Sequence, residues 1–148
     1  MWDFLKVHKY IITLIWVGIV LAISFMGAPL KFQSELVDTR VGVSIGRIVF
    51  TFLNRVEVIF LIIYTILTLA SGSFKRSYLL HILIGIVLIQ TFILLPFLDE
   101  RALKIVQKQP VEDSILHMNY VILELIKVIV LIWVSVYEIK IKPIFHEK

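Results

Sequence analysis

Long apolar runs alternate with short polar segments along the whole chain. Four of these runs are long enough for an α-helix to cross the hydrocarbon core of a bilayer, which takes about 20 residues. Lys, Arg, Trp and Tyr gather at the ends of the runs, as they do where membrane helices meet water. We therefore predict four membrane spans, over about residues 10–28, 44–70, 78–98 and 114–136.

The segments between the runs predict short loops and one additional helix. Pro29 is expected to end the first span, and residues 30–43 are expected to form a polar loop. Residues 99–110 mix charged and apolar positions and end at Pro110, which predicts a short helix in the membrane interface. The predicted fold class is all-α, an integral membrane four-helix bundle with short loops, in a single transmembrane domain over residues 1–148.

The composition agrees with a membrane location and excludes several other classes of protein. Hydrophobic residues make up 59% of the 148 residues and charged residues 18%, against about 45–50% and about 25% in soluble domains. A soluble enzyme, a disordered tail and a secreted disulfide scaffold are thereby excluded, and the lipid bilayer is the predicted partner. The chain has no cysteine and therefore no thiolate metal site. Its net charge of +4 comes from scattered Lys and Arg near the spans, which does not indicate a nucleic-acid partner.

The distribution of Lys and Arg around the spans predicts the orientation of the chain. Four spans place the N-terminus, the second loop and the C-terminus on one side of the membrane. This side holds seven basic residues and the other side five: Lys6, Lys9, Lys75, Arg76, Lys140, Lys142 and Lys148 against Lys31, Arg40, Arg101, Lys104 and Lys108. Because cytoplasmic loops carry the excess of positive charge, we predict that both termini are cytoplasmic, in the inner membrane of a bacterial cell.

Polar side chains inside the spans are the most informative positions, because they are expensive in lipid and usually face the interior of a bundle. At about 3.6 residues per turn, two spans carry such residues along one face, and a third span adds an amide. The residues are Arg47, Asn54, Glu57 and Tyr64 with the adjacent Arg55 in the second span, Gln90 in the third, and His117, Tyr120, Glu124 and Lys127 in the fourth. A rise of about 1.5 Å per residue places the two glutamates and Gln90 at similar depths.

This group of residues permits two interpretations. In the first, Glu57 and Glu124 form the centre of a pocket that binds or moves a small solute, a cation or a proton, with His117 at its mouth. In the second, Arg55 or Lys127 neutralises the glutamates, and the residues form a structural network in a non-catalytic accessory or scaffold protein. The uncharged polar residues are expected to make hydrogen bonds between helices in either case.

Two histidines offer a third interpretation. His8 and His81 lie at the same predicted membrane face, where they could together bind a haem iron in a haem- or metal-associated enzyme. Two interfacial histidines that reach the lipid headgroups are the simpler explanation, and no three histidines share a level, so no cofactor and no metal site are predicted. The sequence has no nucleotide-binding or serine-hydrolase motif, which favours a protein that is not an enzyme.

Small residues in the first span indicate where another helix could pack. Gly18 and Ala22 form a small-xxx-small pair, which lets two helices approach closely. Four helices rarely enclose a complete transport path, so a transport function would require more than one copy. A homo-oligomer is the corresponding expectation.

Several short motifs resemble those of known membrane families. WVG at 16–18, APLKF at 28–32, GRIVFTFLNRVE at 46–57 and SILH at 114–117 are similar to motifs of the DUF4149-type family of small four-span membrane proteins. This resemblance implies a four-helix membrane fold and no established activity. The segment LKVHKYIITLIWVG at 5–18 also resembles the first helix of the copper-resistance-D-like superfamily, whose haem-pathway member implies a haem or metal role for His8 alone.

Overall fold

The computed structural model describes residues 2–72, 77–112 and 114–140, and the regular elements in this part of the chain are all helical. They are α1 (Trp2–Val20), the π-helical segment η1 (Leu21–Gly27), α2 (Ala28–Leu30), the 3₁₀ turn η2 (Lys31–Gln33), α3 (Thr39–Ala70), α4 (Tyr78–Ile89), the π-helical turn η4 (Gln90–Leu94), α5 (Leu95–Val106) and α6 (Leu116–Lys140). Four stretches are long and apolar enough to cross a membrane, namely Val7–Gln33, Thr39–Ala70, Tyr78–Val106 and Leu116–Tyr137. The predicted all-α class with four spans is therefore confirmed.

The first and third spans continue beyond their predicted ends at residues 28 and 98, because the helix continues past Pro29 and Pro96 to Gln33 and Val106. A proline lacks a backbone N–H, and its ring clashes with the carbonyl four residues earlier. A π-helical segment precedes each proline in the structure. The N–H of Ala28 and the N–H of Leu95 each donate to the carbonyl five residues earlier. This wider turn accommodates the proline ring, so the helix continues through Pro29 and through Pro96.

The structure corrects two predictions about the connections. The interfacial helix predicted over residues 99–110 is not a separate element, because α5 continues from η4 without a break and ends at Val106. The polar loop predicted over residues 30–43 is reduced to residues 34–38, because the first span runs on through η2. α3 then begins directly after Asp38, whose side chain caps it by accepting a backbone hydrogen bond of 2.8 Å.

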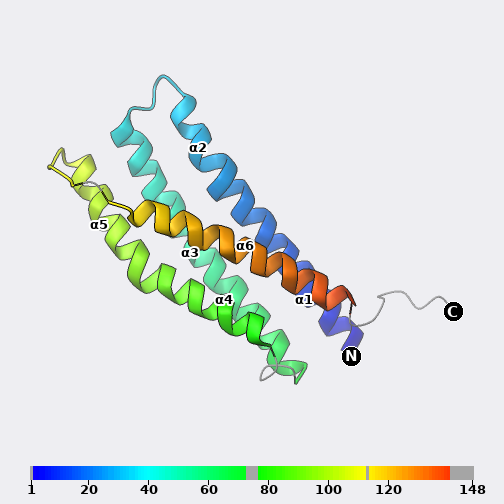
Figure 1. Cartoon of the computed structure of the whole chain (residues 1–148). Coiled ribbons are helices and arrows are strands. Elements are labelled where there is room, and N and C mark those ends of the chain that lie inside the picture. The colour runs from blue at the N-terminus through cyan, green and yellow to red at the C-terminus, as the bar shows by residue number, and fades with distance from the viewer. Residues whose placement is uncertain (1, 73–76, 113, 141–148) are drawn as a thin grey trace.

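The four spans pack side by side and alternate in direction (Figure 1). α1 lies along α6 and also contacts α3, while the third span contacts both α3 and α6. The loop of residues 34–38 and the segment that follows α5 lie at one end of the bundle, here called the distal end. The start of α1 and the end of α6 lie at the opposite end (Figure 1). Both ends of the described chain are thus on one side, and the cytoplasmic location of that side stays a prediction.

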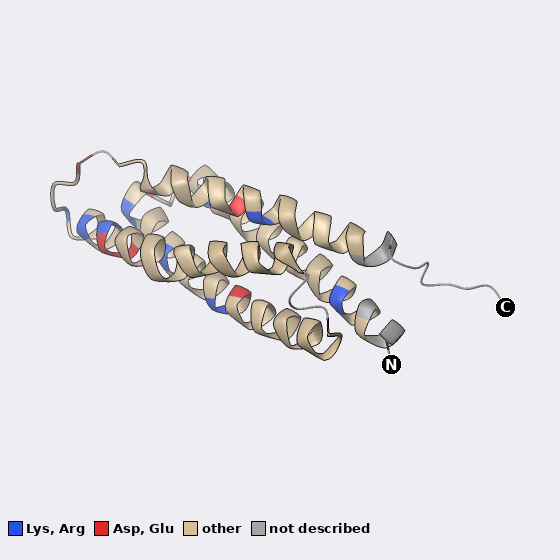
Figure 2. Ribbon diagram, turned by 60° about the horizontal axis from the view of Figure 1, so that its bottom comes forward, with Lys and Arg blue, Asp and Glu red and all other residues tan. Residues whose placement is uncertain are grey.

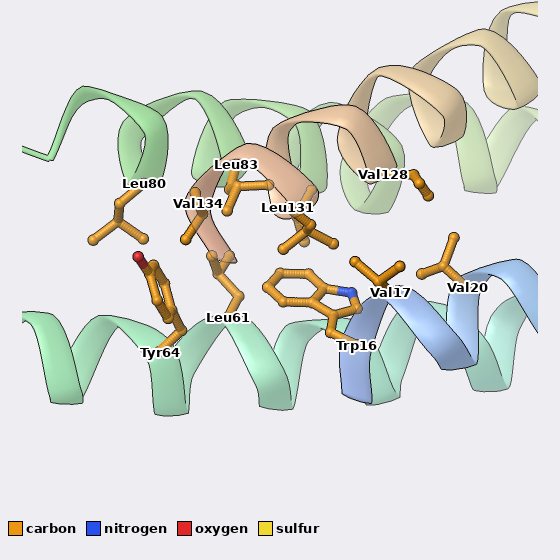
Figure 3. Packing of buried hydrophobic residues seen from close by; sticks show 11 residues of the cluster. Trp16, Val17, Val20, Leu61, Tyr64, Leu80, Leu83, Val128, Leu131 and Val134 are labelled. Carbon is orange, nitrogen blue, oxygen red and sulfur yellow. The ribbon is translucent and has the colours of Figure 1, made fainter. Parts of the chain in front are cut away.

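Apolar side chains hold the bundle together and also cover its outside. Trp16 and Leu131 are fully buried and Tyr64 nearly so, and Figure 3 shows these side chains directed into the space between the helices. Large apolar side chains such as Phe92 and Trp133 are exposed on the outer surface. Charged residues gather at the distal end, while long stretches of the helices carry none (Figure 2). An apolar exterior of this kind is what a bilayer-embedded bundle presents to lipid.

Candidate functional site

Five buried polar side chains from all four spans meet inside the bundle. Trp16 comes from α1, Glu57 from α3, Gln90 from the start of η4, and Glu124 and Lys127 from α6, and each is at most 1% exposed. We call these five residues the acid–lysine cluster. Burial of this extent removes the side chains from both water and lipid, so they must satisfy one another.

Lys127 is the hub of the acid–lysine cluster. Its ammonium group forms an ion pair with Glu57 Oε1, and a second one of 3.2 Å with Glu124 Oε1. It also donates a hydrogen bond of 2.8 Å to Gln90 Oε1. An ammonium group has three N–H donors, so all three are used, and they connect α6 to α3 and to η4.

The two carboxylates each receive one further hydrogen bond. The indole Nε1 of Trp16 donates to Glu57 Oε1 over 3.1 Å, and Gln90 Nε2 donates to Glu124 Oε1 over 3.3 Å. On both glutamates the partners converge on Oε1. The second oxygen, Oε2, is buried and has no hydrogen-bond partner among the described residues in either case. Each carboxylate therefore keeps unused acceptor capacity, which is costly in a buried site.

The formal charges of the acid–lysine cluster do not cancel. Two carboxylates face one ammonium group, so the cluster carries one excess negative charge when all three groups are ionised. An uncompensated charge inside a membrane protein is strongly unfavourable unless a proton, a cation or water balances it. Lys127 is thus the base that pairs with both glutamates, and its single positive charge balances the charge of one carboxylate.

Arg55, the other predicted counter-ion, is not part of the cluster. Its side chain is exposed and lines a separate cavity of about 530 Å³ together with Thr51 and Asp99. Residues two positions apart in an α-helix point in directions that differ by about 200° around its axis. Arg55 and Glu57 therefore cannot both face the interior of the bundle. The sequence interpretation in which Arg55 neutralises a buried glutamate is therefore wrong for this structure.

The remaining predicted polar residues occupy the surroundings of the cluster. Asn54 is buried at the contact between α3 and η4, where its Nδ2 donates to Thr91 Oγ1 over 3.0 Å. Tyr64 lies in the apolar core, not in the cluster. Arg47 lies toward the distal end, where it forms an ion pair with Asp99.

A cavity of about 300 Å³ connects the cluster with the distal end of the bundle. We call it the inner cavity, and Ser24, Lys31, Phe50, His117, Tyr120 and Glu124 are among its lining residues. Three buried oxygens of these residues make no hydrogen bond of ordinary geometry to a described residue, namely Ser24 Oγ, the Tyr120 hydroxyl and Glu124 Oε2, and the Tyr120 hydroxyl lies close to the Glu124 carboxylate. Buried polar atoms without such a bond that line one cavity are what a site for a small polar ligand presents.

The histidines form no metal site in the part of the chain that the structure describes. No group of three or more His, Cys, Asp or Glu is placed to hold a metal ion among these residues. His81 Nδ1 lies 2.7 Å from the carbonyl oxygen of Ser77 at the start of α4. The alternative in which His8 and His81 bind a haem together stays untested, and His146 lies outside the described residues.

Sequence reasoning misses one residue of this region, Trp16, and one pairing, that of Asn54 with Thr91. Trp16 was considered only as part of a motif, although a tryptophan in the middle of a span, away from the interface, has an N–H that needs an acceptor. Thr91 is visible in the sequence as a polar residue of the third span, but its pairing with Asn54 is not. Its hydroxyl donates to the carbonyl of Val87 in its own helix and accepts from Asn54. A periodicity argument finds polar faces but does not pair donors with acceptors across helices.

Comparisons with protein-family models, with curated proteins and with solved structures find no match to this chain. The resemblance to small four-span families therefore stays a prediction. The sequence and the structure establish a four-span helical membrane protein with charged and polar residues buried among its helices.

Proposed function

We propose that the acid–lysine cluster binds one proton or one small monovalent cation, and that the chain handles such ions or solutes in the membrane. The observation that carries this proposal is the excess carboxylate. Glu57 and Glu124 share a single lysine, and each keeps a buried Oε2 without a partner. One bound positive charge makes the cluster neutral and supplies the missing interaction.

The inner cavity supports access to this position from the distal end. It reaches Glu124, and its other buried oxygens, on Ser24 and Tyr120, are of the kind that hard cations prefer. His117 lines the same cavity nearer the distal end, where an imidazole could pass a proton inward. Of the residues that the sequence predicts for a pocket, Glu124, Tyr120 and His117 line this cavity, and Glu57 is not among its lining residues.

Movement of an ion across the whole membrane would need a second opening. On the side of the cluster away from the distal end, the apolar core around Trp16 and Leu131 fills the bundle. Gly18 and Ala22 face outward, and a Cβ at Gly18 would meet no atom within 4 Å. This unused small-residue pair supports the expectation that a transporting form would contain more than one copy. The proposed location, a bacterial inner membrane with both termini cytoplasmic, rests on the distribution of Lys and Arg in the sequence.

A second candidate function is that of an accessory protein in which the cluster has only a structural role. Lys127 joins α6 to α3 and η4, and Trp16 adds α1, so the cluster connects all four spans. Under this alternative the cluster keeps one charge state wherever the protein is folded, and it exchanges no proton or cation.

Infrared difference spectroscopy on the purified protein distinguishes the two functions, because a protonated carboxyl group and a carboxylate absorb at different frequencies. In the absence of other monovalent cations, we expect a buried protonated carboxyl group in the wild-type protein at neutral pH. Both E57Q and E124Q should lose this band, because either change leaves one carboxylate opposite Lys127. E100Q is the matched control, since Glu100 is an exposed partner of Lys104 on α5.

Addition of Na⁺ or K⁺ tests the cation version of the proposal in the same sample. A cation that replaces the proton should remove the band of the protonated carboxyl group in the wild-type protein. The spectrum of E100Q should change in the same way. A wild-type protein that shows no protonated carboxyl group and takes up neither cation would refute the proposal. Loss of stability in E57Q and E124Q without any such band would instead favour the structural role.

A further inference from the structure

One lysine at the distal end is directed into the bundle instead of toward water. Lys31 lies at the end of the first span, where a long basic side chain normally extends to the membrane surface. Its Nζ lies 5.0 Å from the centre of the Phe32 ring and 5.7 Å from that of the Phe50 ring. The two rings provide a cation–π environment for the ammonium group, but they do not neutralise it.

Two glycines of α3 make the space for this arrangement. A Cβ at Gly46 would overlap Lys31 Nζ, and a Cβ at Gly42 would overlap the ring of Phe32. The two glycines are four residues apart and therefore share one face of α3. The absence of side chains at these two positions lets the end of the first span pack closely against α3, with the ammonium group of Lys31 directed inward.

The ammonium group of Lys31 borders a second cavity, of about 280 Å³, which we call the outer cavity. Apolar side chains form most of its wall, among them Phe32, Val43, Phe50, Leu95, Leu98 and Ile105. Its volume is close to the lower end of the range for ligand sites, about 300–1,000 Å³. The outer and inner cavities share five lining residues, namely Lys31, Phe32, Phe50, His117 and Tyr120.

The charged groups around the outer cavity leave Lys31 without an acidic partner. Arg47 forms an ion pair with Asp99, the acidic residue of the lining. Arg101 donates a hydrogen bond to the backbone carbonyl of Glu112. Among the described residues, no carboxylate lies within ion-pair distance of Lys31. The lining therefore carries an excess of positive charge beside an apolar chamber, and His117 adds a further hydrogen-bonding group.

We infer that the outer cavity binds an anionic amphiphile, with a carboxylate or phosphate head at Lys31 and one apolar chain among Phe32, Phe50, Leu98 and Ile105. Charge complementarity selects the head, because it supplies the anion that Lys31 lacks. The apolar wall selects the chain, and the bilayer around the bundle is a source of molecules of this kind. The site uses neither Glu57 nor Lys127, so it does not depend on the function proposed for the acid–lysine cluster.

Competition experiments on the wild-type protein test the ligand class. The protein is placed in nanodiscs of phosphatidylcholine and loaded with a fluorescent single-chain fatty acid. We expect an unlabelled fatty acid and an anionic phospholipid to displace the fluorescent probe. The competitor that displaces it more strongly shows whether the natural ligand is a free fatty acid or a phospholipid of the bilayer. The fatty alcohol of equal chain length should be at least about tenfold weaker, because it lacks the charge. Equal displacement by the alcohol, or by acetate or inorganic phosphate alone, would overturn the inference.

Variants test the position of the head. K31Q should weaken binding of the fatty-acid probe by about tenfold or more, the effect of losing a charge-assisted hydrogen bond. K104Q is the matched control, because Lys104 is exposed at the same end and pairs with Glu100 within its own helix. E57Q should also bind as the wild type does. Equal affinities of K31Q and K104Q would contradict the inference.

A second variant keeps the charge and moves it. G46A introduces a methyl group at the position of Lys31 Nζ, and the flexible lysine can move aside without unfolding the helix. We expect weaker probe binding without a lower melting temperature, because alanine also favours the helix more than glycine does. If K31Q does not fold, this variant and the wild-type competition decide the question, and wild-type affinity in G46A would count against a head group at Lys31.

Discussion

Replacement of Lys127 by methionine removes the hub of the acid–lysine cluster while keeping the length of the side chain. The change leaves Glu57 and Glu124 facing each other across a buried space without a counter-ion, and it leaves the Gln90 carbonyl without its donor. Trp16 and the Gln90 amide still donate one hydrogen bond to each carboxylate. The perturbation therefore isolates the role of the ammonium charge.

The expected loss of stability follows from this arrangement. Removing one partner of a buried ion pair typically destabilises a protein by about 3–5 kcal/mol, because the remaining charge stays buried. The change E57Q retains an oxygen that can accept from Trp16 and leaves Glu124 balanced by Lys127, so its cost should be about 1 kcal/mol. K127M should thus be much less stable than E57Q, although both remove one charged group.

The pH dependence of this difference gives the test its direction. The folded K127M protein becomes neutral only by taking up a proton on each carboxylate, so its stability should rise as the pH falls. Unfolding by sodium dodecyl sulfate, followed by circular dichroism at several pH values, measures this for K127M, E57Q and the exposed control K104M. A K127M protein that is as stable as E57Q at neutral pH, or that gains nothing at acidic pH, would refute the reasoning.

Three smaller perturbations test other parts of the structure. W16F should reduce the free energy of unfolding by about 1.5–3 kcal/mol, because it removes the hydrogen bond to Glu57, and a wild-type unfolding curve would contradict that bond. The backbone N–H of Val41 lowers the pKa of Asp38 at the start of α3. The cap therefore stabilises the folded protein above the ordinary pKa of a carboxyl group, and this stabilisation is lost as the pH falls through the lowered pKa. The melting temperature of D38N should therefore depend less on pH than that of the wild type. G42L should lower the melting temperature, because its side chain would overlap an aromatic ring of the first span, and an unchanged melting temperature would show that the helices can separate there freely.

The number of spans and their approximate places could be predicted because hydropathy is a local property. Each apolar run must be helical in lipid, because the α-helix is the conformation in which a single segment satisfies all of its own backbone hydrogen bonds. The ends of the first and third spans could not be predicted in the same way. A proline normally interrupts a helix, and the hydropathy pattern does not show that a π-helical segment accommodates Pro29 and another accommodates Pro96.

The acid–lysine cluster shows the same division for the site. The helical period alone placed Glu124 and Lys127 on one face, and it also separates Arg55 from Glu57 by about 200°. Depth estimates correctly brought Gln90 to the level of the glutamates, where its amide now contacts Glu124. Neither argument identified Trp16 as a partner of Glu57, because that contact depends on how α1 is rotated and tilted against α3.

The sequence by itself determined that this chain is a four-span membrane protein and that a few ionisable residues lie among its apolar helices. These properties follow from the free energy of transferring each segment to lipid, which is set by composition and periodicity. Only the tertiary structure decided that Lys127 serves two glutamates while Arg55 serves none, and that Lys31 turns inward beside an apolar cavity. Such pairings depend on the rotation, tilt and stagger of four helices at once, and one helix does not encode the position of its neighbours.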